Sequence, residues 1–190
     1  MKKILSVFIV AILIVLIGLY QYSKVEAKKS EAEMTHNILI TYYSYSGNTK
    51  AVAEKIQKLT GGDIAEIVPV KPYPTGYNDV VSLAKTEKEQ NIMPEIKPLN
   101  KDVKDYDVIF VGTPVWWYTM ASPVKTFLAN NNFEGKIIVP FCTHGGGGES
   151  ATFTDMKKLA PKAEIKNGYS TYERTANGKD AEKWIKSLDL

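Results

Sequence analysis

Short apolar runs alternate along this chain with stretches whose apolar residues recur every three or four positions. Continuous or alternating apolar runs of four to eight residues are typical of strands, and the longer periodic stretches are typical of amphipathic helices. Alternation of the two predicts a parallel sheet with helices on both faces. The runs that predict strands begin at Ile38 and comprise residues 38–40, 64–70, 107–111, 136–141 and 164–171.

The predicted helices follow these strands. Val52, Ile56 and Leu59 share one helix face, which Gly61-Gly62 ends. The other helices are expected over 77–90, from an N-cap at Ser122, from a cap at Ser150 or Thr152, and after Asn177-Gly178. We expect the charged residues of 85–89 to form a solvated helix face.

The first 27 residues predict a targeting segment. Lys2 and Lys3 precede an uncharged, mainly apolar run over residues 4–20. This run is longer than a usual signal-peptide core and slightly short for a full membrane span. Val25-Glu26-Ala27 offers a site for a signal peptidase. The sequence therefore predicts an exported protein, either secreted or anchored by residues 4–20 and facing outward.

The rest of the chain predicts a polar linker over 28–36 and one domain over 37–190. The whole chain carries 24 Lys+Arg and 21 Asp+Glu, and without residues 1–27 the balance is about +1. This near-neutral balance argues for neither a nucleic-acid partner nor an acidic one, and we expect no nucleic-acid partner. Cys142 is the one cysteine, so an intramolecular disulfide is impossible. We expect it to be a small core residue.

A hydroxyl-rich turn follows the first strand, at Ser44-Tyr-Ser-Gly-Asn-Thr49. It lies between a strand and a helix N-terminus, where free backbone N–H groups and the helix dipole favour a phosphate. The turn contains no lysine and matches neither a P-loop nor a dinucleotide-binding turn. Neutral donors of this kind suit a terminal phosphate monoester. The alternative is a serine-rich turn that only caps its helix.

Two further strand ends are chemically unusual. Thr113-Pro-Val-Trp-Trp-Tyr118 places three aromatic residues at an expected loop tip, either as a stacking surface for a flat ligand or as a hydrophobic plug. Thr143-His-Gly-Gly146 opens a run of four glycines, which lets backbone N–H groups approach a ligand or forms a slack loop. Ligands of such sheets bind beyond the carboxyl ends of the strands. The three segments together predict a site for a phosphorylated planar heterocycle.

In these three segments the sequence resembles the flavodoxin family. Ser44–Thr49 is similar to the family's phosphate motif [ST]-x-[ST]-G-x-T, and 112–117 and 141–146 resemble the corresponding loops of bacterial flavodoxin-like proteins. The resemblance implies an α/β fold: a three-layer, doubly wound, five-stranded parallel sheet in the order 2-1-3-4-5. It also implies FMN as the cofactor. The FMN contacts that it implies are Ser44, Tyr45, Ser46, Gly47, Asn48, Thr49, Thr113, Pro114, Val115, Trp116, Trp117, Tyr118, Thr143, His144, Gly145 and Gly146.

The implied activity is redox chemistry at or outside the membrane, with a partner protein or a small-molecule electron acceptor. An FMN-dependent NAD(P)H oxidoreductase with a quinone-type acceptor and a cofactor-free binding module of the same fold remain alternatives. Soluble flavodoxin carriers are typically acidic and cytoplasmic, and this chain departs from both patterns. No catalytic triad and no metal-ligand spacing is present, so we predict no catalytic side chain and no metal. His144 is expected to be exposed or to lie near the flavin.

Overall fold

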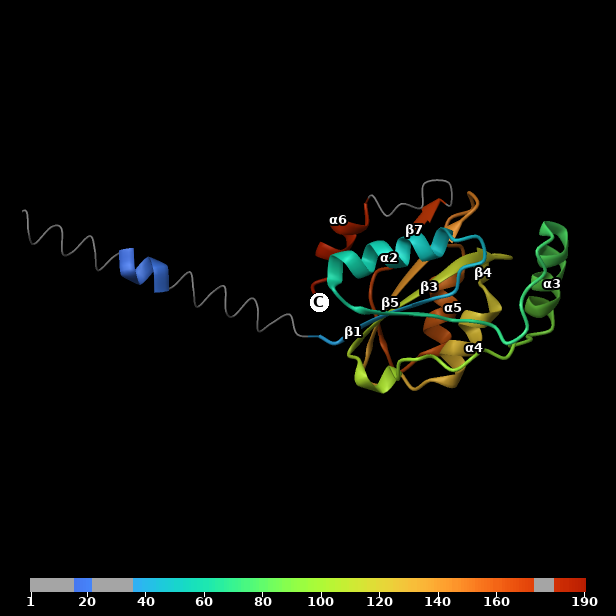
Figure 1. Cartoon of the computed structure of the whole chain (residues 1–190), viewed down its shortest axis with the longest axis horizontal. Coiled ribbons are helices and arrows are strands. Elements are labelled where there is room, and N and C mark those ends of the chain that lie inside the picture. The colour runs from blue at the N-terminus through green and yellow to red at the C-terminus, as the bar shows by residue number, and fades with distance from the viewer. Residues whose placement is uncertain (1–15, 22–35, 173–179) are drawn as a thin grey trace, which may run out of the picture. The chain divides into compact units, whose positions relative to one another are not determined.

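The computed structural model describes residues 16–21, 36–172 and 180–190, and a parallel β-sheet lies at the centre of the domain that begins at His36 (Figure 1). The sheet order is β2-β1-β3-β5-β6, with β7 also paired to β5 and β4 to β3. The strands are β1 (Ile38–Tyr42), β2 (Asp63–Glu66), β3 (Val108–Trp116), β4 (Thr119–Met120), β5 (Ile137–His144), β6 (Glu164–Ile165) and β7 (Tyr169–Tyr172).

Strands β6 and β7 act as two parts of one fifth strand. Both pair in parallel with β5, the first at Ile137 and Ile138 and the second from Phe141 to His144. Residues 166–168 interrupt them. Counted as one strand, they give the order 2-1-3-4-5, so the predicted fold is confirmed.

Helices cover both faces of this sheet (Figure 1). On one face, the α6 residue Trp184 meets the β3 residue Phe110 with ring centroids 5.7 Å apart. On the other, Ile109 belongs to the hydrophobic cluster that also contains Val124 and Phe127 of α4. Adjacent residues of a strand point to opposite faces, so β3 is buried from both sides. The helices are α2 (Asn48–Thr60), α3 (Tyr77–Glu89), α4 (Ser122–Asn130), α5 (Thr152–Leu159), α6 (Ala181–Lys186) and the 3₁₀ turn η1 (Val103–Asp105).

The structure corrects several predicted boundaries. Strand β2 ends at Glu66 rather than at residue 70, because Pro69 leaves the sheet to form a separate bridge with Ile96. Helix α4 begins at Ser122 with Ala121 as its N-cap, whose N–H is held by the Thr113 hydroxyl at 3.0 Å. Neither Ser150 nor Thr152 caps α5.

Two predictions about side-chain environment and loop conformation are also wrong. Glu87 is 5% exposed, so the face of α3 expected to be solvated is interrupted by a buried carboxylate. The predicted loop at Thr113 continues strand β3 to Trp116 and turns back into β4. In both cases the cause is a tertiary contact, described below, that local periodicity does not contain.

The N-terminal segment is described only at residues 16–21, which are helical and exposed. The remainder of the predicted targeting segment lies outside the described residues. Within the described parts of the chain, no helix has both the length and the apolar character that crossing a membrane requires.

A close approach at Gly112 sets the spacing of the two central strands. A Cβ at this position would lie 2.1 Å from Cζ of the buried Phe141 ring. We predict that Gly112→Ala lowers the free energy of unfolding by about 3 kcal/mol, because the ring is enclosed and cannot move away. Chemical denaturation measures this change. Gly147→Ala, where nothing lies within 4 Å of the added methyl group, is the control, and an equal loss in both variants would contradict the interpretation.

Candidate functional site

The turn between β1 and α2 leaves polar groups without partners. Gly47 is the N-cap of α2 and has φ 87°, a conformation that favours glycine. The Ala51 N–H bonds the Gly47 carbonyl at 3.0 Å, so the N–H groups that precede it lie in the unbonded first turn of the helix. The Ser44 hydroxyl oxygen is buried and has no hydrogen-bond partner. An orphaned buried hydroxyl beside a free helix N-terminus fits a bound anion.

The other side chains of this turn are held by the protein itself. Asn48 Nδ2 donates to the Ser46 hydroxyl at 3.0 Å. The Tyr45 hydroxyl donates to the Pro74 carbonyl at 2.7 Å and so connects the turn to the segment before α3. These bonds fix the shape of the turn around Ser44 and Gly47.

A hydrogen bond between two threonine hydroxyls joins the first and third predicted segments. Thr49 Oγ1 and Thr143 Oγ1 lie 2.8 Å apart, and both residues are buried. They are 94 positions apart in the sequence. The structure therefore brings together two of the segments that the sequence placed at one ligand site.

The second segment forms a hairpin with an unusual turn. Val115 pairs with Met120 and Trp116 with Thr119, which leaves Trp117 and Tyr118 as the two turn residues. Their φ angles are 49° and 68°. Two-residue turns with positive φ at both positions usually contain Asn or Gly, and a bulky residue in this conformation costs on the order of 1–3 kcal/mol.

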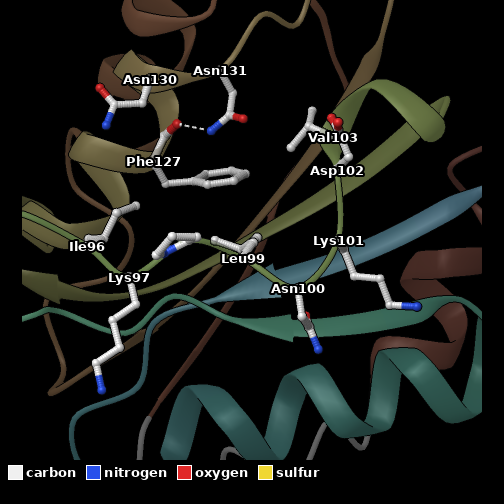
Figure 2. Close-up of a pocket in the computed structure, with 11 residues that line it drawn as sticks. Ile96, Lys97, Leu99, Asn100, Lys101, Asp102, Val103, Phe127, Asn130 and Asn131 are labelled. Atoms are coloured by element: carbon white, nitrogen blue, oxygen red, sulfur yellow. Dashed lines mark hydrogen bonds between the residues drawn. The ribbon is translucent and has the colours of Figure 1, made fainter.

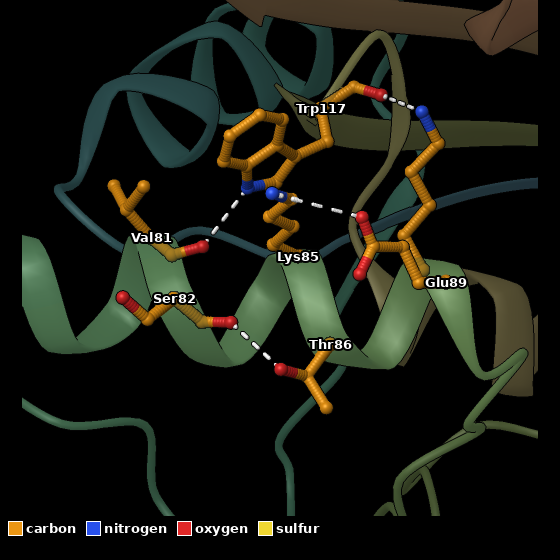
Figure 3. A network of polar contacts seen from close by, with 7 residues as sticks. Val81, Ser82, Lys85, Thr86, Glu89 and Trp117 are labelled. Atoms are coloured by element: carbon orange, nitrogen blue, oxygen red, sulfur yellow. Dashed lines mark hydrogen bonds and ion pairs between the residues drawn. The ribbon is translucent and has the colours of Figure 1, made fainter.

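Helix α3 holds this strained turn in place (Figure 3). The Trp117 indole N–H donates to the Val81 carbonyl at 2.9 Å, and Lys88 Nζ donates to the Trp117 carbonyl at 2.7 Å. The ammonium of Lys85 lies 5.5 Å from the centre of the Trp117 ring. The sequence left two alternatives for the aromatic segment, a stacking surface or a hydrophobic plug. Trp117 fits the plug, because its indole is engaged with α3.

Trp116 belongs to a cluster of aromatic rings that reaches the first segment. Its ring centroid lies 5.0 Å from that of Tyr73, 5.5 Å from Tyr43 and 5.9 Å from Tyr45. Burial raises the pKa of Tyr43 and of Tyr73, and a hydrogen bond to Glu87 raises the pKa of Tyr73 further. These phenols therefore stay protonated at neutral pH. Tyr118, by contrast, is 68% exposed and presents its ring to solvent.

The third segment begins at the end of β5. His144 is half-buried, and its Nδ1 accepts the Gly146 N–H at 3.1 Å. Its ring centroid lies 6.2 Å from that of Tyr172. Gly145 and Gly146 are exposed, and Gly146 has φ 121°. The backbone of this loop is open to a ligand, as expected from its glycines.

The remaining predicted residues, Pro114 and Val115, are half-buried parts of β3. Sequence reasoning missed Tyr43 and Tyr73, whose rings lie against Trp116, and Glu87, which accepts the Tyr73 hydroxyl. Tyr73 lies in the least regular stretch of the sequence, and Glu87 looks like any surface glutamate of an amphipathic helix. No local signal identifies either of them.

A cavity of about 560 Å³ lies away from the three predicted segments (Figure 2). It is lined by the segment from Ile96 to Val103 and by the end of α4, including Phe127 and Asn131. Residues 96–103 precede β3, so this cavity is near the amino end of that strand. The predicted site is at the carboxyl ends of the strands, and the two do not share residues. Within the described residues, no group of three or more His, Cys, Asp or Glu is placed to hold a metal ion.

Comparison with known proteins identifies similar sequences and folds. Residues 37–188 match the family model described as flavodoxin. A flavoprotein from Bacteroides eggerthii is 30% identical, with 82% of this chain and 99% of that one covered and a TM-score of 0.72. A flavoprotein from Lactobacillus acidophilus, solved in complex with FMN, is 28% identical, with 80% and 99% covered and a TM-score of 0.63.

Cys142 lies within β5, next to the third segment, and its burial makes the thiol unreactive. The residue is fully buried, and burial raises its pKa from 9.0 to about 12. We predict no reaction with Ellman's reagent at pH 8 in the folded chain and complete reaction in guanidinium chloride. The neutral thiol's contribution to stability falls as pH rises from 9.0 toward 12, because the unfolded state loses its proton first. Rapid reaction of the native protein would contradict this environment.

Proposed function

The chain belongs to the flavodoxin family, and we propose that it is an FMN-binding redox protein that transfers electrons at or outside the cytoplasmic membrane. The observation that carries the cofactor assignment is the buried, unpartnered Ser44 hydroxyl beside the N-terminus of α2. The family match and the FMN complex of the Lactobacillus acidophilus relative support the same cofactor.

The residues present fit FMN in a particular way. Ser44 and the first backbone N–H groups of α2 would hold the phosphate, while Thr49 and Thr143 keep the two segments together through their 2.8 Å hydrogen bond. Tyr118 and the glycines at 145 and 146 would border the ring, because they are the exposed members of their segments. The bound flavin would supply the electron transfer, and the protein would tune it by contacts at the ring.

The same orphaned hydroxyl favours a bound phosphate over a turn that only caps its helix. A helix-capping serine would have found a backbone N–H as its partner, and no side chain caps α2. Stopped-flow mixing with NADH and NADPH tests the oxidoreductase alternative. Rapid bleaching of the flavin by either nucleotide would favour an enzyme, and stable oxidised flavin favours a carrier that another protein reduces.

The location outside the cytoplasm rests on the sequence of residues 1–27. The basic start and the apolar run over 4–20 suit a segment that crosses or enters a membrane. A near-neutral domain also differs from the acidic surface of soluble flavodoxin carriers, which suits a different electron partner. We therefore place the redox partner at the membrane or beyond it.

The phosphate assignment predicts that FMN and riboflavin bind with different affinities and respond differently to changes in the turn. Residues 28–190 should bind FMN with a stoichiometry of about 1:1 and bind riboflavin more weakly, as measured by titration calorimetry. Ser44→Ala should weaken FMN binding about 10- to 100-fold, because a hydrogen bond to a charged group is worth about 1.5–3 kcal/mol. Riboflavin binding should barely change, since riboflavin has no phosphate.

The matched control is Ser82→Ala, which removes a hydroxyl from the exposed face of α3. It should leave the affinity for both ligands unchanged. Thr49→Ala should also weaken FMN more than riboflavin, because riboflavin lacks the phosphate that Thr49 is proposed to contact. Equal losses of FMN and riboflavin in Ser44→Ala, with circular dichroism unchanged, would show that this turn does not bind phosphate.

Export gives a separate prediction. A reporter enzyme fused after Leu190 should be active only outside the cytoplasm, because the basic start and the apolar run direct the domain across the membrane. The mass of the mature chain then distinguishes cleavage near Ala27 from anchoring. A reporter that is active only in the cytoplasm would refute this location.

A further inference from the structure

A cavity of about 280 Å³ lies beside the strained hairpin, between α3, β4, α4 and α5. None of the residues predicted to contact FMN lines it. Its wall contains Glu87 and Lys88 of α3, Met120 of β4, Lys125 of α4, and Leu159 of α5. These residues come from four elements, so the fold builds the cavity rather than a single loop.

The carboxylate of Glu87 is mostly buried and accepts one hydrogen bond from the protein. Glu87 is 5% exposed, and its Oε2 accepts the Tyr73 hydroxyl at 2.6 Å. Within the described residues, this is the one hydrogen bond given to the carboxylate, and no ammonium group lies close enough to pair with it. A buried carboxylate requires donors for both oxygens. Glu87 lines the cavity and its Oε1 is not an enclosed atom, so an occupant of the cavity can donate to this oxygen in place of water.

Two ammonium groups of the same wall form hydrogen bonds to neutral oxygens, and that of Lys88 also lies 5.7 Å from the centre of the Tyr118 ring. Lys88 Nζ bonds the Trp117 carbonyl at 2.7 Å, and Lys125 Nζ bonds the side-chain oxygen of Asn91. Each ammonium has three N–H donors, so both retain donors for another group. Lys158 differs, because it pairs with Asp155 at 2.8 Å.

The carboxylate of Asp155, which also lines the cavity, already has its charge paired. Burial raises the pKa of Asp155, but hydrogen bonds from Lys158 and Thr119 outweigh it and hold the pKa below its usual value. Asp155 is therefore an anion with both oxygens occupied, at 2.8 Å from Lys158 and 2.7 Å from the Thr119 hydroxyl. The charge of Lys125 also lowers the pKa of Asp155, but the hydrogen bonds to Asp155 come from Lys158 and Thr119, so Lys88 and Lys125 keep N–H donors for an incoming anion.

The remaining wall is apolar and sets the size of the occupant. Met120 is 5% exposed, and Leu159 is half-buried. At the packing density of protein interiors, about 280 Å³ has room for roughly a dozen non-hydrogen atoms. Such a molecule would bury an apolar body against Met120 and Leu159.

We propose that this cavity binds a small organic acid with a hydrogen-bond donor beside its carboxylate, as in 2-hydroxy and 2-amino acids. The carboxylate lies at the ammonium groups of Lys88 and Lys125, and the adjacent donor completes the partners of Glu87. The apolar body of the acid contacts Met120 and Leu159. This binding site does not depend on the flavin, and it is separate from the predicted FMN contacts.

The test uses the full chain labelled with ¹³C at its methionine methyl groups, in detergent, with three matched probes. These are 3-phenyllactate, 3-phenylpropionate, which lacks the hydroxyl, and 3-phenylpropane-1,2-diol, which lacks the carboxylate. Phenyllactate should shift the Met120 methyl resonance but not that of Met156, which is fully buried and does not line the cavity. It should bind about tenfold more tightly than either analogue.

Two variants assign the donors and acceptors. Glu87→Gln should lower the preference for phenyllactate over phenylpropionate, because an amide oxygen is a weaker acceptor than a carboxylate. Lys125→Gln should lower the preference for phenyllactate over the diol, because Lys88 alone then holds the carboxylate. Glu89→Gln on α3 and Lys157→Gln on α5 change exposed residues outside the cavity wall and should leave both ratios unchanged. Equal binding of all three probes, no shift of Met120, or ratios that survive both cavity variants would overturn the proposal. Loss of FMN binding in Ser44→Ala leaves these ratios unaffected, so failure of either proposal is distinguishable.

Discussion

The parallel pairing of β1, β3 and β5 is the constraint on which the site depends. Tyr42 pairs with Gly112, and Gly112 pairs with Phe141, so the three strands reach their carboxyl ends in register. Parallel strands with short connections must place the segments that follow them at one edge of the sheet. The hydroxyl turn, the aromatic hairpin and the glycine loop meet there for that reason. Gly112 permits this arrangement, because any side chain would collide with the Phe141 ring.

The hairpin at Trp117 and Tyr118 shows how the fold sustains a strained segment near a functional edge. Left-handed backbone at two bulky residues is unfavourable in isolation. Two hydrogen bonds and a cation–π contact from α3 offset that cost. The same contacts attach α3 to the end of β3. The same attachment positions Glu87 against Tyr73 and encloses the cavity beside the hairpin. The irregular stretch before α3 and the predicted ligand edge are thus parts of one structural unit.

The alternation of strands and helices predicts a parallel sheet with its ligand edge at the carboxyl ends of the strands, and the resemblance to a known family implies the order of the strands. Continuous apolar runs such as 107–111 identify buried strands without any tertiary information. The environments of Glu87 and Trp117 are different, because each is decided by a partner far away in the chain. Trp117 was predicted at a loop tip, yet its indole bonds to Val81, 36 positions earlier. Glu87 has the spacing of a surface residue, and only the Tyr73 hydroxyl marks it as part of the interior.

The central claim is that a phosphate occupies the turn between β1 and α2. Phosphorus NMR of FMN bound to the full chain tests this directly, because a free phosphate monoester titrates with a second pKa of about 6. Neutral donors and the helix N-terminus favour the dianion, so the bound resonance should stay at its dianion position from pH 8 down to about pH 5. A bound resonance that titrates near pH 6, as in free FMN, would show that the phosphate is in solvent and contradict the account.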